Sequence, residues 1–175
     1  MVWAGVRART QQAVFPKLTS PTTHWHGSRG MKWCQLMDKV KHLLGLKGPP
    51  GKLILHLGGN DLASTPLKEM VNDIKNDLQA LKVLMPGTRI IWSDITARRE
   101  YRHALSSPKI EKARKSLNYK VHVLICQMGG SFVKHPALKW DARDLYRPDG
   151  VHLSNMGNDI LLKDWQSTLF GTPSR

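Results

Sequence analysis

The fold is decided by the stretch Lys52-Leu53-Ile54-Leu55-His56-Leu57-Gly58-Gly59-Asn60-Asp61. Its first six positions form a short, nearly continuous apolar run, which is typical of a strand buried on both faces of a parallel sheet. The two glycines allow a sharp turn and a close approach to a ligand at the strand end. The amide of Asn60 can then point a donor into the crevice where such sheets bind ligands. Taken alone, the segment is better explained as a plain strand-to-helix turn, because Asn and Asp favour turns.

Helices and strands alternate on either side of this stretch. Apolar residues at helical spacing predict helices over 31–46, 66–85, 107–128 and 155–170. Short apolar runs predict further strands over 89–93 and 131–133. This order predicts an α/β fold, a three-layer sandwich in which helices flank a parallel sheet. The length of 175 residues fits a single domain over 1–175.

A second informative segment is Asp149-Gly150-Val151-His152-Leu153-Ser154, which leads from a loop into the last predicted helix. An Asp three residues before a His can place its carboxylate against the imidazole, fix its tautomer and leave the other ring nitrogen as a general base. The alternative is a capping Asp beside an ordinary surface His. We expect Ser154 to cap the helix that follows.

Together, and in this order, the two segments resemble the SGNH/GDSL-type hydrolase family, over about residues 24–170. The resemblance implies an SGNH/flavodoxin-like sandwich, in which Asn60 and the backbone N–H of Gly30 (or, alternatively, Gly27) form the oxyanion hole. It also implies that Asp149 and His152 are the catalytic acid and base. A narrower resemblance is to the SGNH-like domains of retroelement-derived vertebrate proteins, where runs similar to Gly-Met-Lys-Trp and Asp-Gly-Val-His-Leu-Ser recur together.

The block that carries the nucleophilic serine in this family, Gly-Asp-Ser or Gly-His-Ser, does not occur in the sequence. We therefore expect a domain that is N-terminally incomplete and lacks its first strand. The function predicted by descent is acyl-ester hydrolysis on a small ester substrate, inactive or very weak in this chain. Ser28 and Ser93 are candidate substitute nucleophiles. Ser28, however, does not lie in a Gly-x-Ser-x-Gly elbow, the turn that would enforce exposure of its hydroxyl.

The charge supports an alternative function. Lys and Arg number 27 against 13 Asp and Glu, which gives a net charge of +14. Such an excess favours binding of nucleic acid or an acidic partner, so a non-catalytic basic binding module on the same fold is the second hypothesis. Arg98, Arg99 and Arg102 follow a predicted strand and could line a substrate rim or contact phosphates. A solvated basic surface without a partner explains the same charge.

Other functions find no support in the sequence. The two cysteines and the eight histidines show no metal-ligand spacing, so we expect no metal site, and the implied mechanism needs no cofactor. No apolar run approaches the roughly 20 residues that span a bilayer, and the N-terminal residues lack a signal-peptide core. These features predict a soluble intracellular protein of the cytoplasm or nucleus. They leave its substrate and oligomeric state open.

Overall fold

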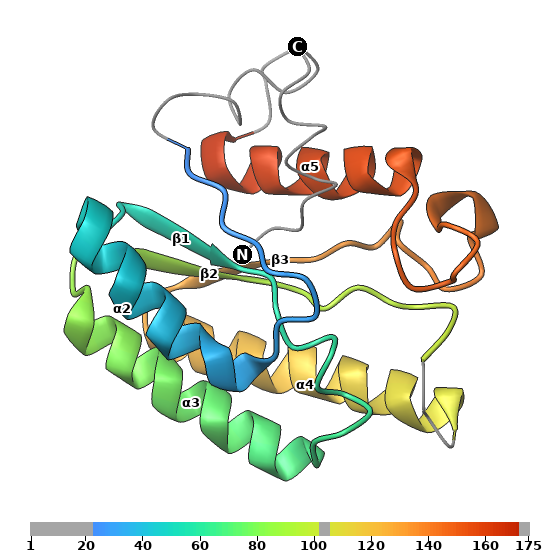
Figure 1. The fold of residues 1–175 in the computed structure, drawn as a ribbon, viewed down its shortest axis with the longest axis horizontal. Helices are drawn as coiled ribbons and strands as arrows, with labels where there is room; N and C mark the ends of the chain where they lie inside the picture. Colours follow the sequence, from blue (N-terminus) through green and yellow to red (C-terminus); the bar gives the residue numbers. More distant parts are fainter. Residues whose placement is uncertain (1–22, 102–105, 172–175) are drawn as a thin grey trace. The chain divides into compact units, whose positions relative to one another are not determined.

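The computed structural model describes residues 23–101 and 106–171, and this part of the chain forms two compact units (Figure 1). The sheet unit comprises residues 30–95 and 106–132, and the C-terminal unit comprises residues 23–29, 96–101 and 133–171. The prediction of an incomplete N-terminus without the first strand concerns residues outside those described, as does the rim residue Arg102. That 1–175 is a single domain stays a prediction.

The sheet has three strands, in the order β1 (Lys52–Leu55), β2 (Arg89–Ser93) and β3 (Ser131–Val133). β1 and β2 are parallel, and their register places Leu55 beside Trp92. β2, the middle strand, is buried on both faces from Ile90 to Ser93. β1 differs from the prediction for it, since Leu55 alone is fully buried and the strand ends two residues earlier than expected. The predicted α/β class with a parallel sheet is confirmed.

Three helices complete the sheet unit: α2 (Leu36–Lys47), α3 (Leu67–Leu84) and α4 (Ser107–Gln127). The helix predicted over 31–46 is a short 3-10 helix, η2 (Trp33–Gln35), that continues into α2. Figure 1 shows α3 and α4 beside each other below the strands, and α4 contacts β2. The buried stripe of α3 recurs every three or four residues, which is the spacing that predicted the helix: Met70, Ile74, Leu78 and Leu81.

The C-terminal unit contains a 3-10 helix, η3 (Arg143–Leu145), and α5 (Asn155–Phe170). Ser154 is the N-cap of α5, and its Oγ accepts a hydrogen bond from the backbone N–H of Gly157 at 3.2 Å, so the predicted cap is confirmed. The buried face of α5 includes Trp165, whose ring centroid lies 6.0 Å from that of Trp25. Among the described residues, no helix is long and apolar enough to cross a membrane.

Candidate active site

The predicted acid and base lie together in the C-terminal unit. Nδ1 of His152 is 2.5 Å from Oδ2 of Asp149. The other carboxylate oxygen, Oδ1, accepts hydrogen bonds from the backbone N–H groups of Val151 and His152, each at 2.9 Å. Because a carboxylate can only accept, Nδ1 carries the proton and the basic lone pair of the ring is on Nε2. This is the tautomer that a general base requires.

The same contacts set the charge state of Asp149. Burial is the largest single influence on its pKa and raises it. The hydrogen bonds from the backbone and side chain of His152 and from the N–H of Val151, together with the attraction of His152, outweigh burial and hold the pKa well below its ordinary value of 3.8. Asp149 is therefore ionised throughout the neutral range.

This depressed pKa predicts a pH dependence of stability. A carboxyl with a lowered folded-state pKa stabilises the fold above its unfolded pKa of about 3.9, and the stabilisation is lost as the pH falls through the folded value. We expect Asp149→Asn to lower the thermal unfolding midpoint at pH 5, and the gap from the unaltered chain to narrow as the pH falls from 4 toward 2. Melting curves recorded by circular dichroism would measure it. A gap that stays constant over this range would contradict the prediction.

Position 150, between Asp149 and His152, accepts only glycine without strain. Its φ is +64°, and a Cβ there would come within 2.6 Å of Cγ of Glu100. Its carbonyl oxygen accepts hydrogen bonds from the backbone N–H groups of Arg99 (2.8 Å) and Glu100 (3.1 Å). The segment that holds the predicted rim residues Arg98 and Arg99 thus packs against the Asp149–His152 loop, with both arginines half-buried.

The two predicted oxyanion donors lie in the sheet unit, on neighbouring loops. Gly30 occupies an exposed turn with a φ of +68°, which favours glycine. The next residue, Met31, accepts a 3.1 Å hydrogen bond through its carbonyl from Nδ2 of Asn60. Asn60 itself is exposed at the turn that follows β1. The side chain of Asn60 therefore reaches the residue directly after Gly30.

Asp61 joins the same two loops and was not singled out by the sequence. Its side chain is buried, and both carboxylate oxygens lie 3.2 Å from the backbone nitrogen of Trp33, which donates to them. Nζ of Lys32 adds a 3.3 Å bond to Oγ of Ser64. These contacts hold the loop of Gly30 against the loop of Asn60. An Asp after Asn suggested only a turn, because nothing in the sequence indicates a partner 28 positions away.

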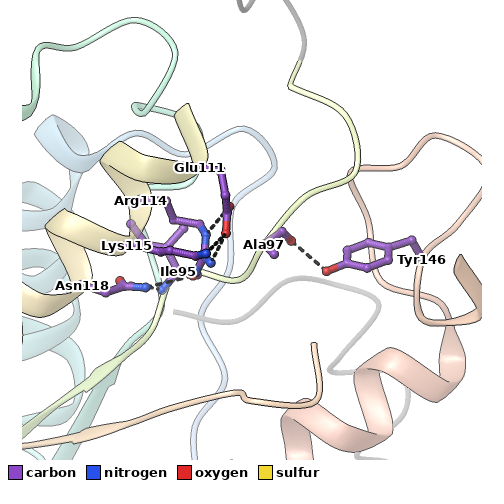
Figure 2. Close-up of polar contacts among 7 residues, drawn as sticks. All are labelled: Ile95, Ala97, Glu111, Arg114, Lys115, Asn118 and Tyr146. Atoms are coloured by element: carbon purple, nitrogen blue, oxygen red, sulfur yellow. Dashed lines mark hydrogen bonds and ion pairs between the residues drawn. The ribbon is translucent and has the colours of Figure 1, made fainter. Parts of the chain in front are cut away.

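Two carbonyls of the segment after β2 accept hydrogen bonds, each from residues of its own unit (Figure 2). In the sheet unit, the carbonyl of Ile95 accepts from Nη1 of Arg114 at 2.6 Å and from Nδ2 of Asn118 at 3.1 Å. Glu111 holds the guanidinium of Arg114 through two bonds of 2.8 and 2.6 Å. In the C-terminal unit, the hydroxyl of Tyr146 donates to the carbonyl of Ala97 at 3.0 Å. These bonds hold the carbonyl of Ile95 within the sheet unit and the carbonyl of Ala97 within the C-terminal unit.

The two candidate substitute nucleophiles, Ser28 and Ser93, differ in exposure. Ser28 lies in the C-terminal unit, within an exposed run over residues 27–29. Ser93 is fully buried, and its Oγ is 2.9 Å from Nδ1 of His56. His56 comes directly after β1, and Ser93 is the last residue of β2. Their contact therefore joins the ends of the two paired strands. Burial keeps the hydroxyl of Ser93 from an external ester.

No group of three or more His, Cys, Asp or Glu that could hold a metal ion is found among residues 23–101 and 106–171.

No protein-family model matches this sequence, and no curated protein matches it. Solved structures do match its fold. A GDSL-like lipase from Parabacteroides merdae superposes with a TM-score of 0.74 at 20% identity, over 95% of this chain and 81% of that one. A GDSL-like lipase from Bacteroides thetaiotaomicron gives 0.73 at 16% identity, over 93% and 82%. An acetyl xylan esterase from Geobacillus stearothermophilus gives 0.69 at 19% identity, over 98% and 83%.

These likenesses define the class of fold. The chain has the α/β fold of SGNH/GDSL-type hydrolases, as its motifs predicted. Because the sequence identities in these three pairs are 20% or less, the similarity establishes the fold and does not establish the chemistry of the site.

Proposed function

We propose that the chain is an SGNH-type esterase domain that retains the acid–base half of the catalytic machinery. The observation that carries the proposal is the pairing of Asp149 with Nδ1 of His152, which makes Nε2 the basic nitrogen of the ring. Asn60 and the N–H of Gly30 would be the oxyanion donors, and Arg98 and Arg99 would line the substrate rim. The reaction requires no metal and no cofactor.

The nucleophile limits the activity that we propose. A complete enzyme would attack the ester carbonyl with a serine hydroxyl whose proton passes to Nε2 of His152. The sequence contains no Gly-Asp-Ser or Gly-His-Ser block. Serine hydrolases that lose one triad member keep roughly 10³–10⁴-fold catalysis over water, so we place the activity of this chain at or below that range. Descent from retroelement-derived SGNH-like domains stays a prediction.

The test measures hydrolysis of p-nitrophenyl acetate, an activated ester that water attacks slowly. We expect a rate above buffer that depends on the acid–base pair, so that His152→Ala removes most of it and Asp149→Asn reduces it strongly. His42→Ala is the matched control, because His42 is an exposed histidine on α2 and free imidazoles also hydrolyse this ester. Equal losses in the His152 and His42 variants would refute the proposal.

Labelling with a fluorophosphonate, read by intact mass, tests the nucleophile separately. We expect no mass increase in this chain. A labelled chain that loses its label on Ser28→Ala would show that Ser28 has taken the role of nucleophile. In that case the esterase proposal would stand, and the proposed loss of activity would be wrong.

A further inference from the structure

Helix α4 has an exposed face that differs from those of the other helices in the sheet unit. Its exposed charged residues are all lysines: Lys109, Lys112, Lys115 and Lys120. The helix contains one acidic residue, Glu111, and it is half-buried and held by Arg114. On α3, by contrast, two exposed acidic residues balance two exposed lysines. The excess positive charge of the sheet unit is therefore concentrated on α4.

The four lysines share one side of the helix. Positions 109, 112, 115 and 120 fall on a single stripe at 3.6 residues per turn, and the stripe extends over about 16 Å at 1.5 Å per residue. Nζ of Lys115 is 3.7 Å from a carboxylate oxygen of Glu111, but its side chain is 70% exposed, which keeps that ion pair weak. A row of this length can contact several consecutive phosphates.

Tyr119 lies within the same stripe and has 69% of its surface exposed. An exposed aromatic ring among lysines provides a face on which a nucleic-acid base can stack. The faces of the bases are accessible in a single strand, whereas in a duplex the bases are already stacked on one another. The combination of lysine row and aromatic ring therefore fits a single strand better than a duplex or a lipid surface.

We propose that the face of α4 formed by Lys109, Lys112, Lys115, Tyr119 and Lys120 binds single-stranded nucleic acid. The lysines contact the phosphates and the ring of Tyr119 stacks on a base. Each phosphate contact on a single strand contributes about 0.7 to the slope of log affinity against log salt. Four contacts therefore contribute a slope of about 3, which corresponds to an affinity loss of roughly 50-fold between 50 and 200 mM salt.

The experiment is fluorescence anisotropy of the full chain with a labelled 12-nucleotide single strand at several salt concentrations. The test variant replaces the four lysines of α4 by glutamine. The matched control replaces Lys41, Lys47, Lys68 and Lys75, exposed on α2 and α3, and so removes the same charge. We expect the α4 variant to lose most of the salt dependence and the control to keep it. Equal losses in the two variants would overturn the proposal, as would no binding at 50 mM salt.

Tyr119→Ala separates stacking from charge. We expect it to weaken single-strand binding about tenfold or more and to leave the salt slope and duplex binding unchanged. An equal loss for both nucleic acids would refute the stacking role. Vesicles that contain phosphatidylserine are the competing occupant: if they bind the chain more tightly than the oligonucleotide and through the same lysines, the partner is a lipid surface and the proposal fails.

Discussion

Replacing Trp92 by alanine is expected to destabilise the sheet unit by about 3–5 kcal/mol, the cost of removing a large buried aromatic side chain. Trp92 is fully buried in the middle strand β2, and its ring centroid lies 5.9 Å from that of Trp33. Its Nε1 donates to Oδ1 of Asn118 at 3.3 Å, so the substitution also removes a partner from a buried amide. Domains of this size are stabilised by only about 5–15 kcal/mol in total, so the loss is a large fraction of the whole.

Urea unfolding followed by circular dichroism would measure this loss. Trp140→Ala is the matched control, because the same side chain is removed where 59% of its surface is exposed. We expect the control to stay within about 0.5 kcal/mol of the unaltered chain. Similar losses in the two variants would show that Trp92 does not hold the core as its burial indicates.

The elements were predictable because their signals are local. The apolar spacing of Leu67–Leu84 and the short apolar run of Arg89–Ser93 predicted α3 and β2 nearly to the residue. β1 was predicted two residues too long, since apolar character continues through Leu57 whereas strand geometry ends at Leu55. An apolar side chain indicates burial, but a strand ends where its backbone pairing with the neighbouring strand ends, which is at Leu55 beside Trp92.

The same distinction between local and long-range contacts applies to the candidate site. Asp149 and His152 are three residues apart on one loop, so their contact could be predicted from spacing, and the structure confirms it. Asp61 and Trp33, or Gly150 and Glu100, meet only because the folded backbone brings distant segments together. No periodicity or motif records such contacts. The candidate acid and base could therefore be predicted from the sequence, and the residues that pack around them could not.

Gly157→Ala is expected to destabilise the C-terminal unit by about 3 kcal/mol, although alanine is normally the better helix former. Gly157 lies in the first turn of α5, where a Cβ would come within 2.3 Å of the carbonyl oxygen of Leu145 and 3.1 Å of Cδ2 of Leu153. The nearest atom belongs to the backbone, so it cannot rotate away, and relief requires a shift of α5 or of η3. Either shift disturbs the segment that holds His152.

The matched control for this prediction is Gly45→Ala, a glycine inside α2 whose added Cβ would meet nothing within 4 Å. There we expect a gain of about 0.5–1 kcal/mol, because alanine loses less backbone entropy than glycine when a helix forms. Thermal unfolding midpoints of the two variants should therefore move in opposite directions from that of the unaltered chain. If both rise, the close approach of α5 to Leu145 is not a feature of the folded chain, and the cap at Ser154 with its link to the His152 loop would have to be reconsidered.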